Sequence, residues 1–508
     1  MNGFLTDPIR GFIMTVWSVR IPWINEPIKR RFAPSPCIKL PLRHECSQRF
    51  QWLALNRPLD RFKMIMSNVK KPTFPVTRLP GLMLLGILVS GCQHLMPLPD
   101  KPANIAVPEA LPKADTLAVH EFQLDDGQPM IGTLAAVNTR ENDTLSDIAR
   151  HFGLGYNDIS IANPHIAPWT PAPNSRVLLP SQFILPDAPR KGIILNLANM
   201  RLFYYPNEHK VFTYPVGIGR EGWNTPMGLT SIVAKKANPS WVVPESIHQE
   251  HAQKGDSLPN VVGAGPDNPL GLYAMRLGFP RYLIHGTNKP YGIGMQISHG
   301  CVQLYPEDIE VLFRKASVGM PVRIVHQPYL TAWDRDMLYL EANEPLSKWS
   351  GDKSRFRKQL LKQLRQVSAR KKVAVDWQKV DRVIERADGV PMPILAHSPD
   401  EATITANAVE LEHPEQLYKQ PVVAELKDSD WAVLVASFDN EGEAQQLATM
   451  LNHQGPIIPA RKVQKDNTYQ VIAGPFKNKK EVNAVAKRIR MDFEIDVEPL
   501  RPRLISVN

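Results

Sequence analysis

The spacing of apolar and polar residues changes several times along this chain, and each change marks a predicted segment. Within residues 133–180, four apolar residues follow one face of a helix: Leu145, Ile148, Ala149 and Phe152. Thr144 and Asp147 form a helix-starting pair in front of them, and Gly153 is placed to end the helix. With a second short helix and a strand on either side, this segment is predicted to be a small β-α-α-β module.

From residue 190 the pattern changes to short apolar runs with Gly and Pro between them. This spacing over residues 190–326 predicts a mainly-β sandwich or barrel. Residues 327–388 return to helical spacing and predict a helical extension, whose basic surface is either solvated or binds an anionic glycan or lipid. Residues 389–428 are rich in Pro and in acidic residues, which favours a linker.

An internal repeat lies in residues 429–501. Residues 431–438 and 469–476 are both apolar runs that end in Phe, and they can be aligned without a gap. A helical pattern follows each run at the same offset. Strand, helix and strand repeated twice predict an α+β domain with the split β-α-β arrangement. The chain is therefore predicted to be multidomain.

The N-terminal part has the pattern of an exported protein. Three basic residues precede an uncharged apolar run at 82–89, too short to span a bilayer, and Cys92 follows it closely. Residues 64–91 are therefore predicted to be a signal peptide, and the Pro-rich residues 92–130 a tether. Because export signals normally begin a chain, residues 1–63 are interpreted as a disordered, non-native extension upstream of the true start. A real cytoplasmic extension is the alternative.

The composition agrees with this division. The formal net charge of +10 suggests a nucleic-acid partner, but residues 1–91 hold 14 of the 60 Lys and Arg and only 4 of the 50 Asp and Glu. The rest of the chain has 46 of each kind and is formally neutral, which argues against nucleic acid. Four cysteines are too few for a disulfide framework, so each one needs its own explanation.

Two residues of the predicted β domain carry candidate chemistry. His285 and Cys301 are 16 positions apart, and each follows an apolar run typical of a strand. A thiol attacks an acyl carbon as the thiolate, and a hydrogen-bonded imidazole can take its proton. The Gly286 carbonyl could orient that imidazole, and the amides around Gly300 and Cys301 could face an oxyanion. A metal site that includes His299 and an inert buried cysteine are the alternatives. The His299 spacing is a poor match to zinc sites, so no metal and no cofactor is expected.

The stretch before the tether resembles a bacterial lipobox: Val89-Ser90-Gly91-Cys92. This resemblance implies that Cys92 carries lipid. With Gln93 after the cysteine, it implies an anchor on the periplasmic face of the outer membrane.

The two small modules also resemble known families. The first has the motif of a LysM domain at Asn142-Asp143-Thr144-Leu145, which implies binding to glycans that contain N-acetylglucosamine. The repeat segment, including Gly474-Pro475-Phe476, resembles a SPOR domain, whose family binds glycan strands stripped of stem peptides. A helical spacer for the first and a non-binding structural domain for the second are the alternatives.

The histidine and cysteine motifs resemble the signature of the YkuD-type L,D-transpeptidases of the ErfK branch: His285-Gly-Thr-Asn and Ser298-His299-Gly300-Cys301. The resemblance implies that Cys301 is the nucleophile and His285 the general base. Ser298, His299 and Gly300 would shape the nucleophile loop. The substrate would be a tetrapeptide stem of peptidoglycan, which loses its terminal D-Ala and leaves a thioester.

The acceptor of this acyl group stays open. A stem amine would give a 3→3 crosslink, a Lys of an envelope protein would be attached to peptidoglycan, and water would make the site a carboxypeptidase or endopeptidase. Gln303 departs from the Arg or Asn that the family commonly has there. It keeps open a hydrolase and also a non-catalytic lipoprotein that links the outer membrane to peptidoglycan. Trp241, Tyr291 and Met295 are weak candidates for the substrate cleft.

Overall fold

The computed structural model describes residues 120–253 and 257–502. The predicted upstream extension, the signal peptide, Cys92 and most of the tether lie outside the described residues. Within the two described ranges, no helix combines the length and the apolar character needed to cross a bilayer.

A nine-stranded sheet forms the centre of the described chain. Its strands, in spatial order, are β1 (Glu121–Gln123), β8 (Lys210–Pro215), β7 (Arg201–Asn207), β6 (Gly192–Asn196), β17 (Pro321–Val325), β10 (Gly228–Ala237), β13 (Tyr273–Leu277), β14 (Leu283–His285) and β16 (Val302–Gln303). The pairs β6–β17 and β14–β16 are parallel, and the other neighbours are antiparallel.

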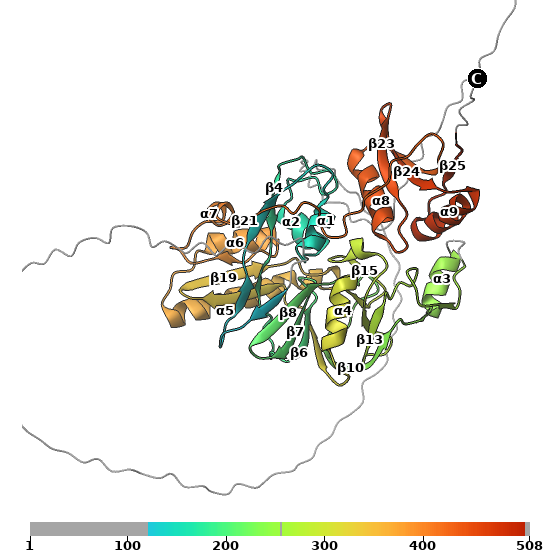
Figure 1. The fold of residues 1–508 in the computed structure, drawn as a ribbon. Helices are drawn as coiled ribbons and strands as arrows, with labels where there is room; N and C mark the ends of the chain where they lie inside the picture. Colours follow the sequence, from blue (N-terminus) through green and yellow to red (C-terminus); the bar gives the residue numbers. More distant parts are fainter. Residues whose placement is uncertain (1–119, 254–256, 503–508) are drawn as a thin grey trace, which may run out of the picture. The chain divides into compact units, whose positions relative to one another are not determined.

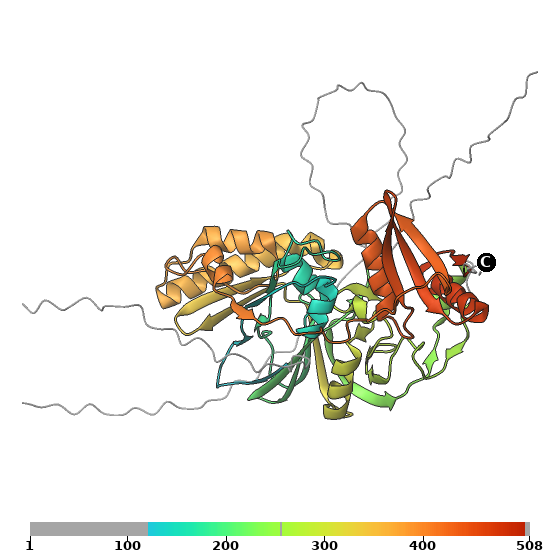
Figure 2. The same cartoon turned by 45° about the horizontal axis from the view of Figure 1, so that its top comes forward.

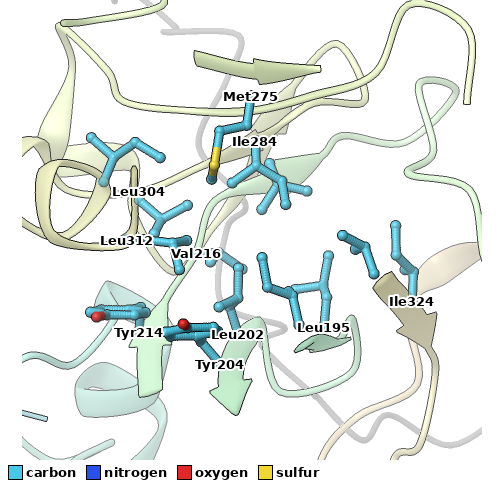
Figure 3. Packing of buried hydrophobic residues seen from close by; sticks show 14 of the residues in the cluster. Leu195, Leu202, Tyr204, Tyr214, Val216, Met275, Ile284, Leu304, Leu312 and Ile324 are labelled. Carbon is cyan, nitrogen blue, oxygen red and sulfur yellow. The ribbon is translucent and has the colours of Figure 1, made fainter. Parts of the chain in front are cut away.

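Strand β10 joins the two halves of this sheet. Its residues 228–231 pair with β17, its residues 232–237 pair with β13, and the register shifts between Ile232 and Ala234. Such an irregularity bends a strand. Both halves contribute to one apolar core, which includes residues of helix α4 (Pro306–Lys315). Figure 3 shows Leu195 and Leu202 from one half with Ile284 and Met275 from the other.

Strands β6 and β7 are buried on both faces. Alternate residues, such as Ile193 and Leu202, pack in the core with α4, and the residues between them, such as Ile194 and Phe203, pack in a second core. A strand covered on both sides is apolar without interruption, as residues 193–195 of β6 are. The second core also contains residues of the small N-terminal module, so this module covers the face of the central sheet opposite α4.

The small module has the predicted order of elements. It consists of β3 (Ala135–Asn138), α1 (Leu145–His151), α2 (Tyr156–Ala162) and β4 (Arg176–Leu179). The Thr144 side chain accepts a hydrogen bond from the Asp147 amide and caps α1, as predicted. The buried Arg201 of β7 donates to Asp158 of α2 at 2.8 Å. This ion pair links the module to the sheet.

Parts of the predicted tether and linker are folded. At the end of the tether, β1 joins the central sheet, and β2 (Met130–Gly132) pairs with β5 (Gln182–Ile184). The predicted linker contains β20 (Met392–Pro393), α7 (Glu401–Ala406) and β21 (Val409–Leu411). Strand β21 pairs in parallel with β3, which lies near the start of the described chain. The linker prediction is wrong for residues 392–411, because short apolar runs among the prolines supply strands to sheets formed elsewhere.

The predicted helical extension begins with a hairpin, which the prediction missed. Strands β18 (Tyr329–Asp334) and β19 (Met337–Ala342) pair, and β20 adds to β19. Behind them follow the 3-10 helix η2 (Ser347–Asp352) and helices α5 (Lys353–Lys371) and α6 (Trp377–Arg386). Figure 2 shows these orange helices along the yellow hairpin. The hairpin also carries Glu341, which is 1% exposed and accepts hydrogen bonds from one backbone and two side-chain amides.

The C-terminal module has the predicted β-α-β-β-α-β order. Its elements are β22 (Trp431–Phe438), α8 (Glu441–His453), β23 (Ala460–Lys465), β24 (Thr468–Phe476), α9 (Lys479–Phe493) and β25 (Glu498–Leu500), coloured orange-red to red in Figure 1. The strands form a four-stranded sheet, and the module has a core of its own. The repeat extends to the helix caps, because Asn440 and Asn478 occupy equivalent positions in the two repeats and begin α8 and α9 with side-chain hydrogen bonds.

Candidate active site

Two short strands bring the candidate thiol and imidazole to one edge of the central sheet. β14 and β16 pair in parallel, with Ile284 opposite Val302 and His285 in the next pair. Ile284 and Val302 point into the core, so the alternate residues project from the other face. Cys301 directly precedes β16, and its sulfur accepts a hydrogen bond from the Leu283 amide. Cys301 and His285 therefore lie on one face of adjacent strands, the arrangement that their sequence spacing suggests.

The His285 imidazole is buried and has a defined tautomer. Its Nδ1 lies 2.6 Å from the Gly286 carbonyl oxygen. Because a carbonyl only accepts, Nδ1 carries the proton and Nε2 keeps its lone pair. Burial lowers the pKa of His285 to about 4, against the opposing effect of the Gly286 and Leu270 carbonyls. The imidazole is therefore uncharged at neutral pH, as a general base must be.

The Cys301 thiol is also neutral at rest. Burial raises its pKa above the ordinary value, against the effect of the Leu283 hydrogen bond. The thiol donates to the Arg281 carbonyl oxygen, with 3.8 Å between sulfur and oxygen. Arg281 has a φ of 74°, a conformation that non-glycine residues rarely adopt. The backbone turn at Arg281 thus carries the acceptor that faces the sulfur.

Two hydroxyl groups hold the loop that carries the thiol. Ser298 Oγ accepts from the Gly300 amide at 3.1 Å and donates to the Cys301 carbonyl at 2.6 Å. Thr225 Oγ1 donates to the Gly300 carbonyl at 2.9 Å and accepts from the Gly219 amide at 3.1 Å. The Gly300 amide, expected to face an oxyanion, donates to Ser298 instead. The role of Ser298 in this loop is therefore to bridge its backbone.

A charged cluster borders the same loop. Arg220 follows β9 (Ile218–Gly219), which pairs with β15 (Gln296–Ser298), and Glu250 lies in α3 (Glu245–Gln253). Glu250 Oε2 is 2.5 Å from Arg220 Nη2 and 3.0 Å from His299 Nε2. The Arg220 and His299 nitrogens are 3.0 Å apart, and the Trp223 ring lies edge-on to His299 with 4.9 Å between centroids. A carboxylate, a guanidinium and an imidazole thus meet beside the nucleophile loop.

The cluster keeps Glu250 ionised. Burial raises the pKa of Glu250, but the hydrogen bonds and charges of Arg220 and His299 outweigh it and bring the pKa down to about 2. Burial lowers the pKa of His299, and the Arg220 charge adds to this effect against the attraction of Glu250. Sequence reasoning missed Glu250, because it is distant from His299 in the chain and belongs to no motif.

The backbone of Gln303 is hydrogen-bonded to that of Gly217. Its amide and its carbonyl both bond with Gly217, each at 2.9 Å. Its side-chain Oε1 is buried and has no hydrogen-bond partner in the described part of the chain. Position 303 therefore presents a neutral polar group.

Each of the three weak cleft candidates has a defined place in the backbone. Trp241 lies in β11 (Trp241–Val242), which pairs with β12 (Val261–Val262). Tyr291 lies in the 3-10 helix η1 (Pro290–Gly292), and the Met295 carbonyl accepts from the Ile218 amide. Among the described residues, no hydrogen bond or ring contact links any of these three side chains to Cys301.

Comparison with known proteins identifies the family. Residues 190–324 match the YkuD model, described as the L,D-transpeptidase catalytic domain. The chain is 37% identical over 284 residues to "Probable L,D-transpeptidase ErfK/SrfK" of Escherichia coli, which covers 54% of this chain and 90% of that protein. The chain belongs to the L,D-transpeptidase family. "Probable L,D-transpeptidase YbiS" of Escherichia coli is 40% identical over 227 residues, 44% of this chain and 74% of that protein.

A second match covers the C-terminal module of this L,D-transpeptidase. Residues 427–494 match the SPOR domain model. This match confirms the interpretation of the internal repeat as a SPOR domain. "Probable L,D-transpeptidase YcfS" of Escherichia coli is 36% identical over 272 residues, 52% of this chain and 85% of that protein.

Proposed function

We propose that Cys301 and His285 carry out the acyl transfer of this L,D-transpeptidase. His285 Nε2 takes the thiol proton as Sγ attacks the carbonyl carbon of the third stem residue. The carbon–nitrogen bond to the terminal D-Ala then breaks, and the leaving amine takes the proton from the imidazole. A second amine attacks the resulting thioester, the thiol recovers a proton, and the new amide is released.

The hydrogen bond from His285 Nδ1 to the Gly286 carbonyl carries this proposal. It fixes the proton on Nδ1, so Nε2 is the atom that can accept, and Cys301 directly precedes the adjacent strand on the same face of the sheet. An uncharged imidazole supports the role of base. The backbone carbonyl takes the place that an acidic side chain has in other triads.

We propose a tetrapeptide stem of peptidoglycan as the donor. The acceptor is a diaminopimelate amine of a neighbouring stem, which gives a 3→3 crosslink, or a Lys of an envelope protein. Water in place of the amine would give a carboxypeptidase. The neutral Gln303 bears on donor choice, because it offers no charge to a substrate carboxylate.

We propose that two modules hold the enzyme on its substrate polymer and that a lipid holds it in the envelope. The β-α-α-β order and the capped α1 support a LysM-like module at residues 133–180, and the SPOR domain supports a second glycan contact. Two weak contacts on one chain raise the effective concentration of stems near the thiol. The lipobox-like sequence supports lipid on Cys92 and a position on the periplasmic face of the outer membrane.

The test is incubation of the purified full chain with tetrapeptide muropeptides, with mass spectrometry of the products. Crosslinked dimers that have lost one D-Ala support transpeptidation, and tripeptide monomers alone indicate hydrolysis. Cys301→Ala should remove either product while the protein still binds peptidoglycan. Products that persist in Cys301→Ala refute the proposed nucleophile, and the absence of any thiol-dependent product would leave a wall-binding lipoprotein.

The anchor needs a separate measurement. Mass spectrometry of the protein from its native host should find an N-terminal Cys92 that carries acyl chains. A peptide from residues 1–63 in the mature protein would contradict the upstream interpretation, and an unmodified Cys92 would contradict the lipid anchor.

A further inference from the structure

We propose that Arg220 is a binding site for a carboxylate of the substrate stem, and that Glu250 occupies this site in the resting enzyme. The inference deepens the proposed function, on which it rests, by naming the group that selects an acidic donor. It also gives α3 a role, because this helix supplies the carboxylate that the substrate must displace.

Arg220 is held against the nucleophile loop by its backbone. Its amide donates to the Ser298 carbonyl at 2.9 Å. The preceding Gly219 is so close that a Cβ there would lie 2.9 Å from the Gly300 Cα, next to the thiol residue in sequence. The Arg220 side chain is 14% exposed and reaches His299 at 3.0 Å. A guanidinium is thus held beside the loop that carries the sulfur.

The proposed substrate carries carboxylates that a cation at this place would bind. A tetrapeptide donor ends in a carboxylate on the residue that leaves, and a diaminopimelate side chain carries another. Gln303 can offer such a carboxylate only a neutral hydrogen bond, whereas Arg at that position could hold it in a bidentate contact. Arg220 is the guanidinium whose side chain contacts the nucleophile loop in the described residues. It can therefore supply the charge that position 303 lacks.

The Glu250 side chain carries the same chemical group as the proposed ligand, a carboxylate. One oxygen, Oε2, contacts both Arg220 and His299, as an oxygen of a bound stem carboxylate would. This oxygen comes from α3, which also places His251 near His299. A carboxylate that stays ionised at every working pH neutralises Arg220 until an equally charged group replaces it. Exchange of one carboxylate for another keeps the guanidinium paired throughout.

The test compares substrates that differ by one charge. Tetrapeptide donors are prepared with a free D-Ala carboxylate, with a D-alaninamide end, and with an amidated diaminopimelate carboxyl. For the full chain, kcat/KM should be about tenfold higher for the free acid than for the amide that removes the recognised carboxylate, the usual effect of one charged hydrogen bond. The amide that loses this preference identifies which of the two carboxylates is bound.

Variants separate binding from structure. Arg220→Gln should raise KM about tenfold for the acid and leave KM for the matching amide unchanged. Arg220→Lys should keep part of the preference for the acid. Glu250→Gln should lower KM for the acid alone. Arg314→Gln is the matched comparison, because Arg314 is an exposed arginine of α4 that also pairs with a glutamate, Glu310. The proposal is overturned if Arg220→Gln lowers kcat/KM equally for acid and amide, or if Arg314→Gln abolishes the preference instead.

Failure of the proposed function has a different signature. If the wild-type chain does not turn over any tetrapeptide, binding of the acid and of the amide to the Cys301→Ala chain is measured by calorimetry. A preference for the acid that depends on Arg220 would still support the carboxylate site. Equal affinity for acid and amide would refute it.

Discussion

Alkylation of Cys301 should become faster with every unit of pH across the neutral range, because the catalytic pair rests as a neutral thiol and a neutral imidazole. The pKa of His285 is about 4, and burial raises the pKa of Cys301 above its ordinary value of 9.0. At least 5 pH units therefore separate the two groups. Moving the proton from sulfur to Nε2 therefore costs about 7 kcal/mol before the attraction between the two new charges is counted, and the neutral pair is the resting form.

The assay treats the full chain with iodoacetamide between pH 6 and pH 9 and quantifies the peptide that contains Cys301 by mass spectrometry. The rate should rise about tenfold per pH unit, with no plateau in this range, because only the thiolate reacts. His285→Gln should change this rate by less than about threefold, since the imidazole is not a charge partner at rest. The same variant should lower transpeptidation by about 10²-fold or more, the usual contribution of a general base.

A plateau below pH 7 would refute this reasoning. It would mean that the thiolate and the imidazolium form a stable pair in spite of their burial, as in cysteine proteases with a strongly lowered thiol pKa. A large loss of alkylation in His285→Gln at pH 7 would have the same meaning. Free N-acetylcysteine in the same buffer is the control for the intrinsic pH dependence of the reagent.

Three further substitutions test contacts around the site and the core. Burial raises the pKa of Glu341 to about 7, so the folded chain keeps a proton there that the unfolded chain releases near pH 4.5. The free energy of unfolding should therefore fall by about 3 kcal/mol as the pH rises from 4.5 to 7. Urea titrations of Glu341→Gln should no longer show this dependence on pH. Thr225→Val should lower the free energy of unfolding by about 1–3 kcal/mol and reduce kcat, because both hydrogen bonds of the hydroxyl are lost. Thr225→Ser should restore both quantities. An unchanged kcat in Thr225→Val would contradict the role of Thr225 in the loop. Asn268 is fully buried and bonds to the Pro239, Gly263 and Leu270 backbone, so Asn268→Ala should lower the thermal midpoint by several degrees, and an unchanged midpoint would contradict this.

Local patterns predicted the elements of the two small modules, and the motif predicted the two strands that meet at the thiol. The C-terminal order follows from a repeat that can be read in one pass, because each helix has its own apolar stripe and its own Asn cap. The pairing of β14 with β16 follows from two apolar runs that each end at a motif residue. In both cases the residues that determine the structure are close together in the chain.

Contacts between distant segments could not be predicted in this way. Strand β21 is very short, and its partner β3 belongs to the small module at the other end of the described chain, so no local signal distinguishes β21 from a linker. Glu250 lies on a polar helix, where a carboxylate is ordinary, and its meaning depends on Arg220 and His299 being brought to it. The hydrogen bond between the Gly300 amide and Ser298 depends on loop geometry that the motif does not encode.

The packing also gives the two glycan-binding candidates different mechanical roles. The module at residues 133–180 shares one core with β6 and β7, so its position relative to the central sheet is fixed by apolar burial and by the ion pair of Arg201 with Asp158. Any glycan that this module binds would therefore be held at a set distance from β14 and Cys301. The SPOR domain closes its core with its own residues, so its fold does not depend on the catalytic sheet. Loss of the first module should therefore open the second core of the catalytic sheet and destabilise the enzyme itself, whereas loss of the SPOR domain leaves that core intact.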